Sequence, residues 1–145
     1  MRPKLLTFLC ALLCVNIFLP WGALAQEKGE HATAPTSQQL TLVKAVMCEE
    51  IKDNAPHNQA IVFPVSNGSV SCFTSFDPVP EKTSIYHKWF YRDKLTARIK
   101  LSLQPPRWST FSRIQLREAD KGPWRVEITD QKGALFYIVR FSITD

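Results

Sequence analysis

Residues 83–91 read TSIYHKWFY and residues 95–103 read LTARIKLSL, with the polar residues Arg92, Asp93 and Lys94 between them. In the second run, apolar residues occupy every other position, and polar or basic residues lie between them. The apolar positions are Leu95, Ala97, Ile99, Leu101 and Leu103. A period of two is typical of a β-strand with one buried face and one wet face. The two runs therefore predict a central β-hairpin in an all-β fold.

The register of this hairpin follows from which side chains can be buried. If Tyr91 lies opposite Leu95, then Trp89 lies opposite Ala97, His87 opposite Ile99 and Ile85 opposite Leu101. A shift by one residue would bury Lys88, and burying an unpaired charge is costly. The first register is therefore expected, and it directs His87 and Trp89 into the core.

Two segments before this hairpin are also expected to be strands. Residues 40–51 fit both strand and helix spacing, and the β character of the rest of the chain favours a strand. Residues 61–66 and 69–74 flank Asn67-Gly68, a strong signal for a two-residue hairpin turn. That turn would pair Val65 with Val70 and Phe63 with Cys72. Pro64 fits poorly, because it has no N–H to donate to the sheet.

Three further alternating runs follow the central hairpin, over residues 108–116, 123–129 and 135–143. In the second run Trp124, Val126 and Ile128 are expected to face inward. In the last run the expected inward residues are Leu135, Tyr137, Val139, Phe141 and Ile143. Seven or eight short strands with regular turns predict an antiparallel β-sandwich, immunoglobulin-like in size.

The N-terminal 25 residues have the features of a secretion signal. Arg2 and Lys4 precede an apolar run over residues 5–19, and a small-residue cleavage site ends at Ala25. The apolar run is shorter than a membrane-spanning helix needs. We therefore expect a signal peptide at 1–25, a flexible leader at 26–39 without large apolar side chains, and a domain at 40–145. The mature protein would be periplasmic or secreted, without a transmembrane helix.

Cys48 and Cys72 are the two cysteines that remain after this cleavage. In an oxidising compartment an isolated pair indicates a disulfide, which would tie the first strand to the rest of the domain. The alternative is a pair of thiolate metal ligands helped by a histidine. The cysteines and histidines have none of the usual spacings of such a site, so the disulfide is favoured and no metal is expected.

No catalytic motif is present in the sequence. Gly-x-Ser-x-Gly and a glycine-rich phosphate loop are both absent, and His87 has no acidic partner in sequence. We therefore expect no enzyme and no cofactor, and a small hydrolase or metal-dependent enzyme centred on His87 remains the alternative. Removal of the signal leaves 16 cations against 13 acids, or about +3, which gives little reason to expect nucleic acid.

A binding module is the favoured interpretation, with a protein or an anionic glycan of the cell envelope as partner. Trp108, Arg107 and Arg113 are the candidate contacts, because an amphipathic ring beside cations can anchor a ligand. His87, Trp89 and Trp124 are expected to form a structural centre. Six basic residues are predicted to point outward and could form a basic face: Arg98, Lys100, Arg107, Arg113, Arg117 and Arg125. A purely structural scaffold, which predicts no exposed aromatic residue, is a further alternative, and the oligomeric state is not predicted.

Four motifs together resemble a known bacterial family. They are His87-x-Trp89, Arg107-Trp108-x-Thr110-Phe111-Ser112, Gly122-x-Trp124-x-Val126 and Phe141-Ser142-Ile143. In order and spacing they are similar to the domain of unknown function 2914, over about residues 42–145. The resemblance implies an exported or membrane-attached β domain of the periplasm. It implies no activity, cofactor or catalytic residue.

Overall fold

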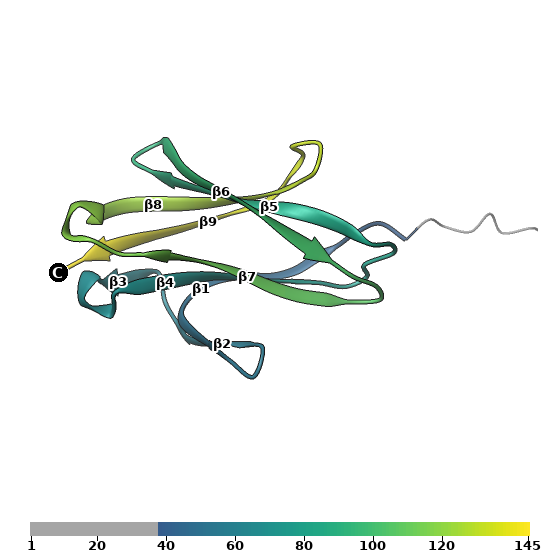
Figure 1. Ribbon diagram of the computed structural model, residues 1–145, viewed down its shortest axis with the longest axis horizontal. Helices are drawn as coiled ribbons and strands as arrows, with labels where there is room; N and C mark the ends of the chain where they lie inside the picture. Colours follow the sequence, from purple (N-terminus) through teal and green to yellow (C-terminus); the bar gives the residue numbers. More distant parts are fainter. Residues whose placement is uncertain (1–37) are drawn as a thin grey trace, which may run out of the picture. The chain divides into compact units, whose positions relative to one another are not determined.

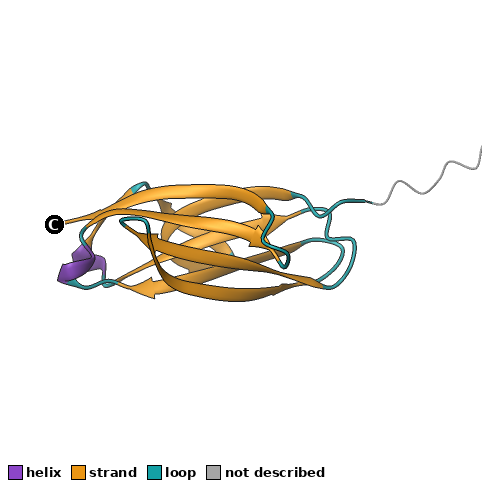
Figure 2. Ribbon diagram, turned by 90° about the horizontal axis from the view of Figure 1, so that it is seen from above, coloured by secondary structure: helices purple, strands orange, loops and turns teal. Residues whose placement is uncertain are grey.

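The computed structural model describes residues 38–145, which form two β-sheets packed face to face (Figure 1). The signal peptide and most of the leader expected from the sequence lie outside the described residues. The strands are β1 (Leu42–Lys52), β2 (Ala55–Gln59), β3 (Val62–Pro64), β4 (Ser69–Phe76), β5 (Thr83–Tyr91), β6 (Lys94–Leu103), β7 (Trp108–Gln115), β8 (Gly122–Asp130) and β9 (Leu135–Thr144). Two short 3-10 turns, η1 (Val65–Asn67) and η2 (Glu118–Asp120), lie at one end (Figure 2).

The first sheet has the order β2-β1-β4-β7 and the second has the order β3-β9-β8-β5-β6. All neighbours are antiparallel except β3 and β9, which pair in parallel. The predicted β-sandwich is therefore confirmed. The strand at the start of the domain, which the sequence left open between strand and helix, is β1.

The core lies between the sheets and is rich in aromatic side chains. Phe141 is central: its ring centroid lies 6.2 Å from that of Phe63, 6.0 Å from Trp89 and 6.1 Å from Trp124. Trp89, Phe63 and Phe76 are fully buried. Large rings in edge-on or stacked contact contribute more than the area they bury, so this cluster fixes the distance between the sheets.

The central hairpin has the predicted register over most of its length. Ile85 lies opposite Leu101, His87 opposite Ile99 and Trp89 opposite Ala97. A bulge between Trp89 and Phe90 then places Phe90, and not Tyr91, opposite Leu95. Leu95 is consequently turned outward and 48% exposed, whereas Leu103 at the other end of β6 is buried.

The hairpin predicted around Asn67-Gly68 is wrong. β3 leaves the neighbourhood of β4 and joins the second sheet, where Phe63 lies opposite Ile143. Pro64 at the end of β3 cannot donate a hydrogen bond, so pairing stops there and η1 carries the chain across to the first sheet. Gly68, with a φ of +71°, makes the sharp entry into β4 that a side chain would disfavour.

The last strand differs from the prediction at its start. A bulge between Ile128 and Thr129 changes the pairing of β8 with β9, and Leu135 and Tyr137 are 53% and 54% exposed. Phe136 instead packs toward the core, with its ring centroid 5.4 Å from that of Phe76. Val139, Phe141 and Ile143 are buried as predicted, and so are Trp124, Val126 and Ile128 of β8.

The predicted disulfide between Cys48 and Cys72 is wrong, because both are free thiols. Cys72 of β4 lies opposite Met47 of β1. The next residue of β1, Cys48, lies opposite Ser71, the residue that precedes Cys72. Adjacent residues of a strand point to opposite faces of a sheet. Cys72 therefore faces the core between the sheets and Cys48 faces the other way, so the thiols are separated by the sheet itself.

Candidate functional site

The β1–β2 hairpin turns away from the second sheet and projects beyond the first (Figure 1). Glu49 anchors it: one carboxylate oxygen accepts a hydrogen bond from the amide of Asn58 at 2.7 Å, and the other from Asn67 at 2.9 Å. Cys48 and Phe73 face away from the core, yet only 0% and 4% of their surfaces are exposed. The outer side of the first sheet is therefore partly covered.

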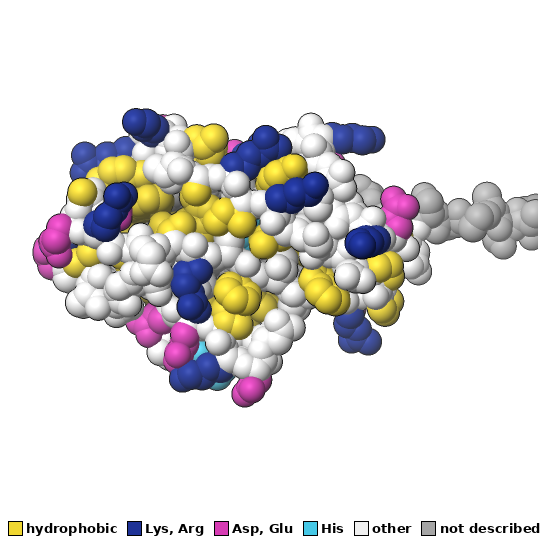
Figure 3. All heavy atoms as spheres, in the orientation of Figure 1, with side chains coloured by type: hydrophobic (Ala, Val, Ile, Leu, Met, Phe, Trp, Pro, Cys, Tyr) yellow, Lys and Arg dark blue, Asp and Glu magenta, His cyan; other side chains and the backbone are white. Residues whose placement is uncertain are grey.

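An open depression of about 540 Å³ lies between the tip of this hairpin and the start of β7. Its walls come from three places that are far apart in sequence: the β1–β2 region, the end of β4 with the loop that follows it, and the start of β7. The lining residues are Val43, Asn54, Ser75, Asp77, Arg107, Trp108 and Ser109. The space-filling view shows the hairpin as a lobe on the lower side of the domain (Figure 3).

The polar and aromatic groups of the depression are held by short contacts. The hydroxyl of Ser109 donates a hydrogen bond to that of Ser75 at 3.0 Å, which links β7 to β4. The backbone N–H of Val79 donates to the carbonyl of Pro106 at 2.7 Å, which ties the two loops that carry Asp77 and Arg107. The indole of Trp108 is 39% exposed.

The three predicted contact residues do not form one site. Arg107 and Trp108 lie together in the depression. Arg113 lies five residues further along β7, which corresponds to about 17 Å of strand. Its Nε donates to the hydroxyl of Ser71 at 3.0 Å, and its guanidinium carbon lies 5.8 Å from the ring centroid of Phe111.

Five of the seven lining residues were not among the contacts expected from the sequence: Val43, Asn54, Ser75, Asp77 and Ser109. Asn and Asp are residue types favoured in turns for local hydrogen bonding, so Asn54 and Asp77 give no signal of a binding site. Nothing in the sequence signals that the hairpin tip approaches the start of β7. The depression depends on that approach, so it could not be found before the fold.

His87 lies at the centre of the core with no exposed surface. Its Nδ1 is 2.7 Å from the hydroxyl of Ser112, and its Nε2 is 3.2 Å from the hydroxyl of Thr74. The indole N–H of Trp89 donates to the same Ser112 hydroxyl at 3.0 Å. Burial lowers the pKa of His87 from 6.5 to about 3, so the imidazole is neutral at pH 7.

This environment supports a structural role for His87 and Trp89 and argues against the enzyme hypothesis centred on His87. The imidazole and a serine hydroxyl are in contact, as in a hydrolase, but Ser112 is only 4% exposed. A substrate cannot reach either group without opening the sandwich. The contact therefore joins β5 of one sheet to β7 of the other and gives no access for chemistry.

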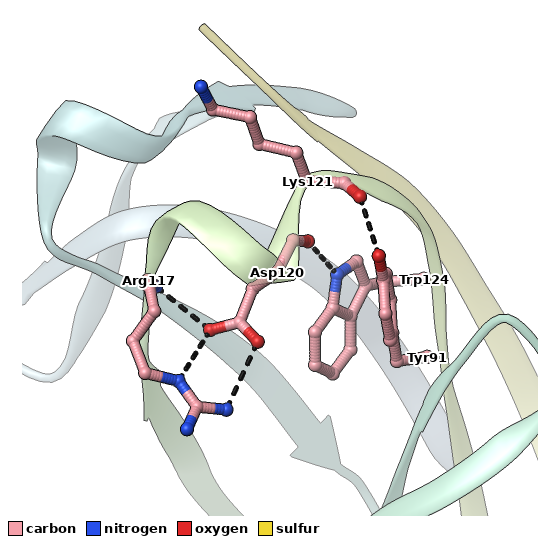
Figure 4. Close-up of polar contacts among 5 residues, drawn as sticks. All are labelled: Tyr91, Arg117, Asp120, Lys121 and Trp124. Atoms are coloured by element: carbon pink, nitrogen blue, oxygen red, sulfur yellow. Dashed lines mark hydrogen bonds and ion pairs between the residues drawn. The ribbon is translucent and has the colours of Figure 1, made fainter.

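Trp124 is held by a polar clasp at the β7–β8 connection (Figure 4). Its indole N–H donates to the carbonyl of Asp120 at 2.6 Å, and the hydroxyl of Tyr91 donates to the carbonyl of Lys121 at 2.7 Å. The Asp120 carboxylate accepts hydrogen bonds from the backbone N–H of Arg117 at 2.8 Å and from its guanidinium at 3.1 Å. These contacts support a structural role for Trp124. The clasp also includes Arg117, whose guanidinium is bonded to Asp120.

The six basic residues expected on an outward face are divided among three places. Arg98, Lys100 and Arg125 lie on the outer face of the second sheet. Arg107 precedes β7 of the first sheet, and Arg113 lies near the end of that strand. Arg117 pairs with Asp120. A single basic face formed by all six is therefore not present.

The two sheets and their central aromatic cluster define an immunoglobulin-like β-sandwich. The chain is similar in fold to an immunoglobulin-like protein from Pseudomonas aeruginosa. The TM-score is 0.51 at 9% sequence identity, over 75% of this chain and 99% of that chain. Residues 82–143 match the family described as "Protein of unknown function (DUF2914)". This match confirms the resemblance indicated by the motifs, over a shorter span than residues 42–145.

No curated protein matches the chain. Within residues 38–145 there is no helix with the length and apolar character needed to span a membrane. The likeness to the solved structure shows the fold alone, and the family description names no activity.

Proposed function

We propose that the protein is an exported, non-enzymatic binding module and that the depression beside Trp108 holds part of a cell-envelope glycan. The observation that supports this most is the exposed indole on the wall of a depression whose other groups are mainly polar. Ligand sites of this kind combine an apolar surface with a few polar groups that fix orientation. Export follows from the signal sequence expected at residues 1–25.

The groups around Trp108 suit a sugar ring. The indole offers a flat apolar surface for the C–H face of the ring. Asp77 accepts hydrogen bonds, Arg107 donates them, and Asn54 and Ser109 can do both. Sugar hydroxyls also donate and accept, so each of these side chains has a complementary group on such a ligand.

The size of the depression favours a glycan over a protein partner. Its volume of about 540 Å³ lies within the range of small-ligand sites, about 300–1,000 Å³. A stable protein interface buries about 800 Å² on each partner, which needs a broader surface. The scaffold alternative predicts no exposed aromatic residue, whereas Trp108, Phe111 and Tyr137 are 39%, 39% and 54% exposed.

Fluorescence of Trp108 provides a direct test. Trp89 and Trp124 are 0% and 6% exposed, so Trp108 is the one tryptophan of the described residues that a soluble quencher can reach. The mature protein is screened against a panel of bacterial envelope glycans. A glycan that binds in the depression should protect the emission from acrylamide.

Two variants make this test specific. Trp108→Ala should abolish binding of the selected glycan, and Trp108→Phe should retain part of it because the ring remains. Phe111→Ala is the matched control, since Phe111 has the same exposed fraction as Trp108 and lies on the same strand. The site is wrong if no glycan protects Trp108, or if Phe111→Ala weakens binding as much as Trp108→Ala.

The export part of the proposal has its own test. N-terminal sequencing of the protein recovered from the periplasm or medium should give a chain that begins at Gln26. A chain that keeps residues 1–25 and stays in the cytoplasm would contradict export without affecting the binding proposal.

A further inference from the structure

The outer face of the second sheet carries five cations in neighbouring positions. Arg140 of β9 lies opposite Arg125 of β8, and Lys88 of β5 lies opposite Arg98 of β6. Arg125 lies opposite Phe90, and Lys88, two residues earlier on β5, lies directly opposite Glu127 and diagonal to Arg125. Lys100 follows Arg98 on the same face of β6. Together these five residues form an oblique line across four strands, here named the cationic stripe.

Two guanidinium groups of the stripe lie over aromatic rings. The guanidinium carbon of Arg98 is 3.9 Å from the ring centroid of Tyr86, and that of Arg125 is 4.0 Å from that of Phe90. Stacking restricts these long side chains before any ligand arrives. A planar guanidinium held in this way keeps its N–H groups available for a carboxylate.

Carboxylates neutralise only one member of the stripe. Arg125 pairs with Glu127, from Nε to Oε1 at 3.0 Å, and also with Asp93. Among residues 38–145, no carboxylate lies within 4.0 Å of the side-chain nitrogens of the other four members. Dark blue groups gather on the upper side of the domain, over the second sheet (Figure 3).

This arrangement is unfavourable for the protein alone. Like charges that lie directly opposite on neighbouring strands destabilise a sheet, and the stripe contains two such pairs, Lys88 with Arg98 and Arg125 with Arg140. Glu127, which lies opposite Lys88 and pairs with Arg125, offsets part of this repulsion. A bound anion would offset the repulsion that remains at Lys88, Arg98, Lys100 and Arg140.

The shape of the stripe indicates the kind of anion. Opposite cations are separated by about 5 Å between Cβ atoms and diagonal ones by about 7 Å, in a line one residue wide. A linear chain with regularly spaced charges fits a line of this kind. A membrane surface would instead favour a cluster of apolar side chains that insert, whereas the exposed apolar residues Val62, Leu95 and Leu135 of the second sheet lie singly at strand ends.

We propose that the cationic stripe binds a linear acidic polysaccharide through pairs between its carboxylates and the side chains of Arg98, Lys88, Lys100 and Arg140, with Arg125 completing the line. This surface belongs to the second sheet, whereas the Trp108 depression belongs to the first. The two sites are independent, and neither proposal requires the other.

The probe is an oligogalacturonide, a linear chain of uronic acids, with a neutral maltooligosaccharide of the same length as the control. Calorimetric titration of the mature protein should show binding of the acidic chain alone, weakening as salt increases. The triple variant Arg98→Gln, Lys100→Gln, Arg140→Gln should weaken binding by about tenfold or more, since three of five cations are lost.

The matched control removes three exposed cations elsewhere: Lys44→Gln, Lys52→Gln and Lys132→Gln. The two triple variants lose the same net charge. If the position of the cations decides binding, the control variant should bind the oligogalacturonide within about twofold of wild type. Arg98→Lys keeps the charge and removes the guanidinium stack, and it should weaken binding by an intermediate amount. Trp108→Ala should have no effect on the acidic chain. Thermal unfolding confirms that each variant is folded.

The remaining arms of the experiment identify the occupant. Vesicles that contain an anionic phospholipid, a polyglutamate peptide and a single-stranded oligonucleotide are titrated under the same conditions. The proposal is overturned if one of these binds more tightly than the oligogalacturonide. It is also overturned if the control triple variant weakens binding as much as the stripe variant, or if the uronic acid chain does not bind.

Discussion

The imidazole Nδ1 of His87 and the hydroxyl of Ser112 lie 2.7 Å apart, and they connect the two sheets through the middle of the core. The contact is part of a longer chain of hydrogen bonds. The indole of Trp89 donates to the Ser112 hydroxyl, and the Thr74 hydroxyl lies 3.2 Å from the other imidazole nitrogen, Nε2. The Thr74 hydroxyl in turn donates to the carbonyl of Thr110.

One assignment of hydrogens satisfies every member of this chain. The indole of Trp89 can only donate, so the Ser112 oxygen accepts from it and the Ser112 hydrogen points to Nδ1 of His87. Nε2 of His87 then carries the hydrogen and donates to Thr74, whose own hydrogen goes to the carbonyl of Thr110. A fully satisfied buried network of this kind specifies one arrangement of the two sheets.

Acid should destabilise the protein through His87. Its pKa is 6.5 in the unfolded chain and about 3 when folded, so the unfolded state binds the proton first. Stability is therefore complete above pH 6.5 and falls as the pH decreases toward 3. Between pH 6.5 and 4.5 the loss should be about 2 kcal/mol.

Urea unfolding at several pH values measures this loss. His87→Gln should be less stable at pH 7, and its free energy of unfolding should depend much less on pH over this interval. His57→Gln is the control, because it removes an exposed imidazole on β2 and leaves the hydrogen bonds of His87 intact. If wild type and His87→Gln had the same slope, the neutral buried imidazole would be excluded.

Loss of the Ser112 hydroxyl should destabilise the fold strongly. Ser112→Ala leaves the indole N–H of Trp89 without an acceptor and Nδ1 of His87 without a donor, both in the core. A buried polar group without a partner costs about 1–3 kcal/mol, so a loss of about 2 kcal/mol or more is expected. Chemical denaturation measures it. Ser109→Ala, which removes one half-buried contact with Ser75, should cost less than half as much.

The central hairpin shows what could be predicted from the sequence. Its alternation fixed which side chains are buried, and the cost of burying Lys88 selected the register that brings His87 and Trp89 inward. Both inferences rest on local pattern and on the large penalty for a buried charge. The bulge after Trp89 was missed, because one extra residue changes the pairing without changing the composition.

The predictions that were wrong depend on contacts between segments that are distant in sequence. Phe63 was assigned to the right environment, the core, but to the wrong sheet, since nothing in the sequence states which strand edge receives β3. Cys48 and Cys72 do lie on paired strands, β1 and β4. A shift of one residue in register decides whether their thiols point to the same face of the sheet. Asn54 reaches the Trp108 depression only because the β1–β2 hairpin projects beyond the first sheet.

The two thiols should remain unmodified in the native protein. Cys48 and Cys72 are both fully buried, and burial raises the pKa of each thiol, so little thiolate is available for reaction. Mass spectrometry should show no alkylation by iodoacetamide under native conditions and two additions after denaturation without reductant. A mature chain that requires reductant before alkylation would contradict the register of β1 and β4.

The clasp at the β7–β8 connection should be sensitive at Asp120 and tolerant at Arg117. Asp120 is 5% exposed and accepts from both the backbone and the guanidinium of Arg117, which hold the pKa of its carboxyl below the usual value. Asp120→Ala should cost about 1–3 kcal/mol at pH 7 because the Arg117 N–H loses its acceptor. Arg117→Ala should cost much less than Asp120→Ala, since that side chain is 79% exposed and solvent screens its charge. The carboxylate contributes above the unfolded pKa of 3.8 and loses its effect as pH falls through the lower folded value. Denaturation of wild type and Asp120→Ala at pH 7 and at pH 2 should therefore show a smaller difference in acid. An equal difference at both pH values would mean that the carboxylate is not charged in the clasp.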